Sequence, residues 1–90
     1  MNGYKNFETW NCYNWLTADE SSVFKWEKAA KEALETGGGD KDEAAIILSK
    51  QIKEAVESEA PELEPGLYID LLNAALQEID YVEVATAFIE

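Results

Sequence analysis

Aromatic side chains are concentrated in one short segment near the start of the chain, YKNFETWNCYNWL, at residues 4–16. This segment holds five of the ten aromatic residues: Tyr4, Phe7, Trp10, Tyr13 and Trp15. Buried aromatic rings dominate small cores, because each one removes a large apolar area from water. We therefore predict that Trp10, Trp15 and the nearby Trp26 lie at the centre of the core.

The segment has the features of a helix. Asn6 is a good N-cap, because its side-chain oxygen can accept a hydrogen bond from a free backbone amide one turn later. Trp10 and Tyr13 share one face, whereas Cys12 and Trp15 share another. A helix that is apolar on two faces is expected to be buried on both, so we predict a central helix, with Tyr4 folded back onto it. The alternative is an aromatic surface that stacks on a ligand or a base.

Further capping signals fall where the hydrophobic pattern breaks. Thr17 followed by Glu20 has the spacing of a capping box, which predicts a second helix from about residue 18 to residue 36. Three glycines at 37–39 end that helix. Asp40 is expected to cap a third helix, which continues to about residue 59, before Pro61.

Two more helices are predicted in the last third of the chain. Pro65 fits the first turn of a helix, because its missing amide hydrogen is not needed there. Apolar residues at helical spacing then continue from Leu67 to Ile79. Asp80 is expected to cap a short fifth helix that runs to the end of the chain.

These patterns agree on one architecture. We predict an all-α fold in which residues 1–90 form a single acidic domain, a compact bundle of four to five helices around the aromatic N-terminal helix. Ninety residues are enough for one domain with one modest core. A hydrophobic content of 47% argues against intrinsic disorder despite the high charge.

The charge excludes several classes of partner. The net charge is −12, from 19 acidic residues against seven lysines, and the chain has no arginine and no histidine. A basic surface is the first mark of a nucleic-acid-binding protein. We therefore expect no direct binding of nucleic acid or of an anionic membrane. The single Cys12 cannot form an internal disulfide, and no stretch is apolar enough to span a membrane, so we expect a cytoplasmic protein.

The residues needed for most catalytic chemistry are missing. Without histidine there is no imidazole base and no histidine metal ligand, and Cys12 has no histidine partner for nucleophilic catalysis. Asp40 and Asp42 resemble the start of a calcium loop, but the later glycine and glutamate of that loop are absent. We predict a non-enzymatic protein with no cofactor, no metal and no catalytic residues. A carboxylate-based metal-dependent enzyme is the least favoured alternative.

The negative charge is concentrated at the end of the chain. Residues 61–90 contain seven acidic residues and no lysine. An uncompensated charge of this kind can attract a basic partner, although it can also serve only to keep the protein in solution. The candidate partner-binding residues are Glu57, Glu59, Glu62, Glu64, Asp70, Glu78, Asp80 and Glu83.

The opening NGYKNFETWN, at residues 2–11, resembles the N-terminal motif of a family of small acidic proteins encoded by phages, plasmids and some bacteria. The motif of that family is NGY-x-N-(F/Y)-ETW. Later residues, from Leu67 to Ala85, also resemble the second half of the family, with Tyr81 where a tryptophan is frequent. The resemblance implies a mobile-element setting, in which small acidic proteins often block host defence or host nucleic-acid enzymes. It implies no catalytic residues.

Together, these observations predict an inhibitor of a basic host protein. The partner would be a defence protein or an enzyme that handles nucleic acid, as for anti-CRISPR and antirestriction proteins. The acidic surface would imitate the charge of DNA and occupy lysines and arginines that otherwise hold phosphates. The alternative is a helical adaptor or oligomerisation module that binds a protein through an apolar face. We expect a monomer or a homodimer, in the host cytoplasm if a phage encodes the protein.

Overall fold

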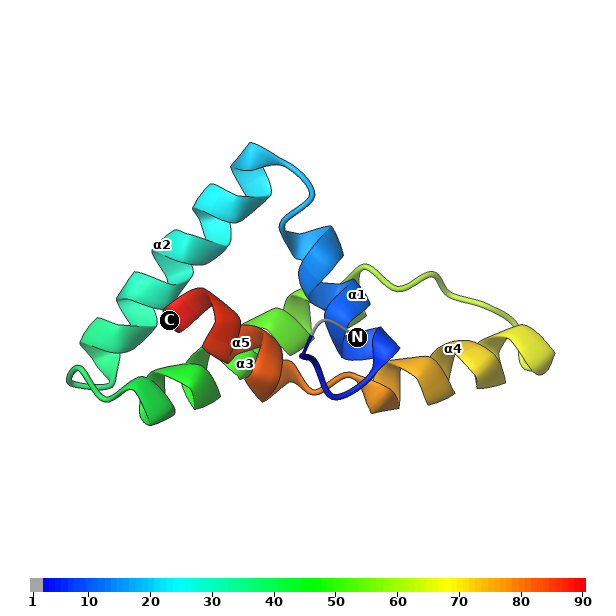
Figure 1. The fold of residues 1–90 in the computed structure, drawn as a ribbon. Helices are drawn as coiled ribbons and strands as arrows, with labels where there is room; N and C mark the ends of the chain where they lie inside the picture. The colour runs from blue at the N-terminus through cyan, green and yellow to red at the C-terminus, as the bar shows by residue number, and fades with distance from the viewer. Residues whose placement is uncertain (1–2) are drawn as a thin grey trace.

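The computed structural model describes residues 3–90, so Met1 and Asn2, the first residue of the NGYKNFETWN motif, lie outside the described residues. The described chain forms five helices and no strand, which confirms the predicted all-α bundle. The helices are α1 (Phe7–Leu16), α2 (Glu20–Thr36), α3 (Lys41–Ser58), α4 (Leu67–Glu78) and α5 (Tyr81–Ile89) (Figure 1).

Three of the predicted N-caps are confirmed. The side-chain oxygen of Asn6 accepts a hydrogen bond of 2.8 Å from the amide of Thr9. Asp40 accepts from the amide of Asp42 at 2.9 Å, and Asp80 accepts from the amide of Glu83 at 3.1 Å. Each bond satisfies a backbone amide that has no partner within its own helix.

The predicted capping box at Thr17 is wrong. The Thr17 hydroxyl donates to the carbonyl oxygen of Tyr13 at 2.8 Å, so this residue ends α1 and does not begin α2. Asp19 caps α2 instead and accepts from the amide of Ser22 at 2.8 Å. This hydrogen bond, together with one from the Ser21 hydroxyl, lowers the pKa of Asp19.

Glycines lie at the C-terminal end of α2 and at the N-terminal end of α4. After α2, Gly38 and Gly39 have φ angles of 68° and 86°, in the left-handed region that favours glycine. Gly66, with a φ of 158°, precedes α4, which therefore begins one residue after the glycine and not at Pro65.

The core lies where α5 packs between α2 and α3 (Figure 1). Half of the ten buried hydrophobic residues are alanines, and they come from all three helices: Ala30, Ala33, Ala44, Ala45 and Ala85. The largest aliphatic side chains in the core are those of Leu48 and Ile52 on α3. Small side chains at these contacts let the helix axes approach one another closely.

The three tryptophans have different environments. Trp26 on α2 is buried, with 5% of its surface exposed, as predicted. Trp15 is 70% exposed, so its predicted place in the core is wrong. Trp10 is only partly buried, and its ring lies 5.8 Å from that of Phe7. Because α1 packs on the bundle with one face only, the apolar residues of its other face remain at the surface.

A chain of aromatic rings links the N-terminal segment to the core. Tyr4 stacks on Tyr13 with 5.8 Å between ring centroids, which confirms that this residue folds back onto α1. Tyr13 lies 5.1 Å from Phe88 of α5, and Phe88 lies 6.5 Å from Trp26 of α2. These pairs favour one position of α1 on the bundle, because tilted and offset ring pairs are attractive.

Thr9 of α1 and Asn6, the N-cap of α1, hold the junction between α4 and α5. The Asn6 amide donates to the carbonyl oxygen of Glu78 at 2.7 Å. The Thr9 hydroxyl is fully buried and accepts from the backbone amide of Asp80 at 2.9 Å. These hydrogen bonds join residues about 70 positions apart in the chain. Residues of the NFETW segment thus fix the place where α4 leaves the bundle.

The first prediction concerns the two tryptophans. Trp26→Ala should lower the free energy of unfolding by about 3–5 kcal/mol, because it leaves a cavity in the core. Trp15→Ala should change it by less than about 0.5 kcal/mol, because the ring is mostly exposed. Urea unfolding followed by far-UV circular dichroism measures both values. Equal losses in the two variants would contradict the assignment of Trp26 to the core.

The second prediction concerns the buried hydroxyl of Thr9. Thr9→Val preserves the volume but leaves the amide of Asp80 without its acceptor, which should cost about 1–3 kcal/mol. Thr9→Ser retains the hydroxyl and is the matched control, with a smaller loss from the missing methyl group. If valine proved as stable as threonine in urea unfolding, this hydrogen bond would have no part in holding α4 and α5 together.

Candidate protein-binding surface

An open groove with a volume of about 580 Å³ lies among α1, α2, α3 and α4. The residues of α1 that line it recur at helical spacing: Phe7, Glu8, Asn11, Cys12, Trp15 and Leu16. The end of α3 contributes Val56, and the last turns of α4 contribute Leu76 and Ile79. The groove is thus lined largely by apolar side chains from helices that are distant in sequence.

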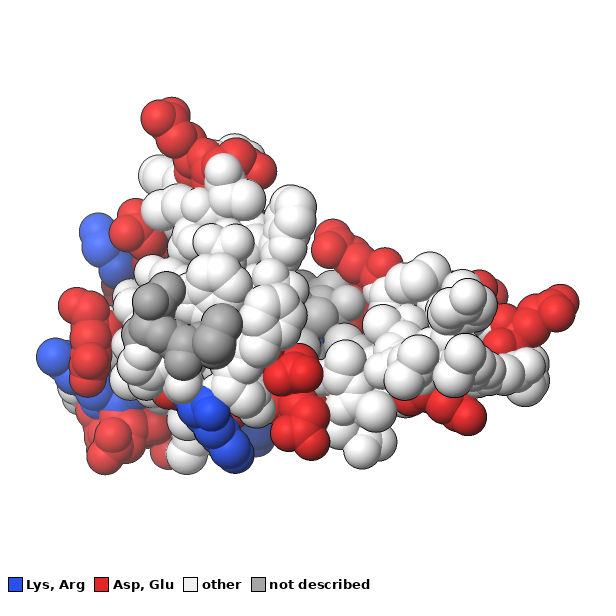
Figure 2. All heavy atoms as spheres, turned by 45° about the vertical axis from the view of Figure 1, so that its right-hand side comes forward, with Lys and Arg blue, Asp and Glu red and all other residues white. Residues whose placement is uncertain are grey.

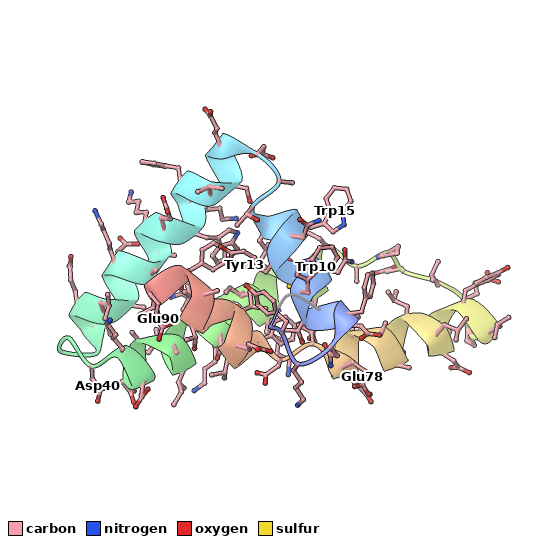
Figure 3. The ribbon with its side chains drawn as sticks, viewed as in Figure 1. Trp10, Tyr13, Trp15, Asp40, Glu78 and Glu90 are labelled. Carbon is pink, nitrogen blue, oxygen red and sulfur yellow. The ribbon has the colours of Figure 1, made fainter. Side chains whose placement is uncertain are left out.

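Helix α1 presents different faces to the core and to the groove. Figure 3 shows Tyr13 leaving α1 towards α2 and α5, whereas Trp15 points away from them. The face that bears Thr9 and Tyr13 packs on the bundle, whereas the face that bears Phe7 and Trp15 remains largely uncovered, at 50% and 70% exposure. The prediction of a central helix buried on both faces is therefore wrong: of the predicted second face, Cys12 is buried but Trp15 is exposed.

Helix α4 extends away from the bundle (Figure 1). None of its residues is buried, and its principal contact is with α1. The molecule accordingly measures 44 Å along its longest axis and 25 Å along the other two. The first turns of α4 expose Leu67, Tyr68 and Leu71 at 67%, 75% and 57%.

The exposed residues of α4 continue the apolar surface of the groove. Tyr68, Leu71, Ala75 and Ile79 recur at intervals of three or four residues, which places them on one face of the helix. Ala75 and Ile79 line the groove, whereas Tyr68 and Leu71 lie beyond it along the same face. We call this combined area, the groove with Tyr68 and Leu71, the α1–α4 surface. Exposed apolar areas of this kind mark sites of protein contact.

Few charges lie inside the groove. Glu8 of α1 and Glu59 at the end of α3 are two acidic lining residues. Lys25 of α2 also lines it, with its ammonium nitrogen 4.9 Å from the centre of the Trp26 ring. This cation–π contact holds the positive charge against the α2 end of the groove.

Cys12 lies in the wall of the groove but is almost fully buried, as predicted. Burial raises the pKa of its thiol from the ordinary 9.0 to about 11. At neutral pH the residue is therefore a protonated thiol, which is a poor nucleophile and a poor metal ligand.

The hydroxyl oxygen of Tyr81, at the start of α5, is buried and has no hydrogen-bond partner among the described residues. Burial, and then the charges of Glu57 and Cys12, raise its pKa to about 12. The group therefore remains a neutral phenol at all ordinary pH values.

The structure divides the eight predicted partner-binding carboxylates into two groups. Six are exposed at the end of α3, in the loop before α4 and on α4: Glu57, Glu59, Glu62, Glu64, Asp70 and Glu78. The other two have roles inside the fold, because Asp80 caps α5 and Glu83 accepts from the backbone amide of Lys5 at 3.0 Å. Asp80 and Glu83 are only partly exposed and are less available to a partner.

On the face shown in Figure 2, the acidic residues do not form one continuous area. Figure 2 shows separate red groups at the edges of the molecule, with white surface between them over α1 and α4. On this face, uncharged surface therefore separates the groups of acidic side chains. Sequence reasoning found the carboxylates but placed Trp15 in the core and did not identify the groove. The sequence feature that could have indicated the groove was the second apolar face of the first helix.

Residues 3–90 contain no group of three or more histidine, cysteine, aspartate or glutamate side chains placed to hold a metal ion. Within the same residues, no helix combines the length and apolar character needed to cross a bilayer. Comparison with protein-family models, curated proteins and solved structures gave no match.

The third prediction concerns the reactivity of Cys12. A pKa of about 11 lowers the thiolate fraction at pH 8 by about a hundredfold, and burial also restricts access. Ellman's reagent should therefore label the native protein far more slowly than the same protein in guanidinium chloride. Because the folded state retains this proton to a higher pH, Cys12 contributes stability that falls as the pH rises from about 9 to about 11. Immediate labelling of the native protein would contradict this burial.

Proposed function

We propose that the protein is a non-enzymatic phage or mobile-element protein that binds and inhibits a basic host protein involved in nucleic-acid handling or defence. The observation that carries the proposal is the set of six exposed carboxylates between Glu57 and Glu78. After Lys53 the chain contains no lysine, so the four of these carboxylates from Glu62 to Glu78 have no nearby cation in sequence to neutralise them, whereas Glu57 lies four residues after Lys53. A basic partner would supply the missing charge.

The mode of inhibition follows from the charge of the partner's natural ligand. Double-stranded DNA has one negative charge for about every 1.7 Å of its axis, and proteins hold it with lysine and arginine. Carboxylates on α3, on α4 and in the loop between them would engage the same cations. The protein would then compete with nucleic acid without contacting it.

A second candidate is a helical adaptor or oligomerisation module that binds a protein through an apolar face. It is favoured by the exposure of Trp15, Tyr68 and Leu71 on the α1–α4 surface. The two candidates differ in their response to salt. At 0.1 M salt, attraction between exposed charges is largely screened beyond about 10 Å, so binding through the acidic surface should weaken as salt rises, whereas binding through the apolar face should not.

The fourth prediction tests the acidic surface. The triple variant Glu57→Lys, Glu62→Lys and Glu64→Lys should lose a captured basic host protein, whereas wild type should release it at about 0.5 M salt or on addition of duplex DNA. The readout is retention on immobilised protein, with bound proteins identified by mass spectrometry and each fold checked by circular dichroism.

The matched control is Glu27→Lys, Glu32→Lys and Glu35→Lys, which changes the net charge equally but on the exposed side of α2. It should retain the partner. If both triple variants bind as wild type does at physiological salt, charge imitation is wrong and the apolar candidate is favoured. If both lose the partner equally, net charge alone governs binding and no particular acidic surface is involved.

A further inference from the structure

The α1–α4 surface is much longer in one direction than the groove alone. Tyr68 in the first turn of α4 and Ile79 directly after its last residue are eleven positions apart, which corresponds to about 16 Å along the helix axis. The groove adds a hollow of about 580 Å³ beside the last turns of that helix. A surface with this outline suits an elongated occupant of about three helical turns or more better than a compact small molecule.

The side chains along this surface match the way in which grooves bind helices. Apolar residues at intervals of three and four positions along a bound helix enter such grooves and anchor it. Aromatic side chains are the commonest source of binding energy at protein interfaces. Here Trp15 and Phe7 of α1 and Tyr68 of α4 are exposed in the absence of a partner.

The acidic residues in and beside the α1–α4 surface favour a basic helix as its occupant. Glu8 and Glu59 line the groove against the single lysine Lys25, and Glu62 and Glu64 lie exposed in the loop that follows α3. A second copy of the chain would add another net charge of −12. Because like charges repel, self-association on this surface is disfavoured, whereas lysine or arginine beside an apolar stripe would be attracted.

We infer that the α1–α4 surface binds an amphipathic helix whose apolar stripe is flanked by lysine or arginine. This inference rests on the proposed function, because the helix would be a segment of the basic host protein. The apolar stripe enters between Trp15 and the α4 residues, and its basic flanks meet the carboxylates. The acidic residues then select the partner, and the groove provides a contact that depends less on salt.

The test uses a synthetic peptide as the probe. It has about 18 residues, which span about 27 Å as a helix. Leucines at positions i, i+3, i+4 and i+7 form a stripe, lysines flank it, and a fluorophore at one end reports binding by anisotropy. One control peptide has the same composition in scrambled order, and another has glutamate in place of lysine. The patterned lysine peptide should bind the full-length protein at least about tenfold more tightly than either control.

Variants of the protein locate the binding surface. Trp15→Ala and Leu71→Ala should each weaken binding of the patterned peptide by about tenfold or more, because both remove apolar contacts. The matched control is Phe24→Ala on α2, since Phe24 has the same 70% exposure as Trp15 but does not line the groove. It should change binding by less than about twofold. Circular dichroism confirms that each variant is folded.

Three outcomes would overturn the inference. Equal affinity for the patterned and scrambled peptides would show that only charge is recognised. Equal losses in Trp15→Ala and Phe24→Ala would place the contact elsewhere. A dimer of the wild type in sedimentation velocity that Trp15→Ala abolishes would make a second copy the occupant.

Failure of this inference can be distinguished from failure of the proposed function. If the peptide does not bind but the Glu57, Glu62 and Glu64 triple variant still loses the host protein, the groove has no such role and the acidic inhibitor stands. If the peptide binds as expected but both triple variants retain the host protein, a helix-binding groove exists and the charge-imitating inhibitor is wrong.

Discussion

The nine-residue helix α5 can enter between α2 and α3 because alanine provides so much of the contact. Ala30 and Ala33 on α2, Ala44 and Ala45 on α3, and Ala85 on α5 are all buried. Larger side chains at these positions would force the helices apart, since protein interiors are already closely packed. The buried core that results has few large side chains, those of Trp26, Leu48, Ile52 and Val84, and partly buried residues such as Tyr13 and Phe88 pack against it.

This arrangement leaves α4 outside the bundle. With α5 in the space between α2 and α3, the helix that precedes it has only α1 as its principal neighbour. Hydrogen bonds from Asn6 and to Thr9 hold the end of α4 at residues 78–80, while its first turns extend into solvent (Figure 1). The apolar face of α4 and the second face of α1 therefore remain uncovered, although both have the composition of a core.

The acidic residues and the exposed apolar residues are best considered together. An uncovered apolar surface promotes association, and high net charge opposes it. In this molecule Glu8 and Glu59 line the largely apolar groove, and Glu62 and Glu64 are exposed in the loop that follows α3. On the face shown in Figure 2, uncharged surface separates the acidic groups. Protein interfaces commonly combine an apolar centre with a polar rim. The same charges can therefore keep free molecules apart and attract a partner of opposite charge.

The sequence alone determined the helical class and most helix ends. Caps such as Asn6, Asp40 and Asp80 act on amides two or three residues away, so the information is local and readable from the chain. The start of α2 was missed because Thr17 and Asp19 both fit a cap, and a bond from Thr17 back to α1 decides between them. The sequence named eight candidate carboxylates, but it did not separate the six exposed ones from Asp80 and Glu83, which have contacts within the fold. Only the tertiary structure decided that Trp26 is buried and Trp15 exposed, and that Thr9 holds the amide of Asp80. An apolar face is buried only if another helix reaches it, and which helix does so depends on the packing of residues far apart in the chain.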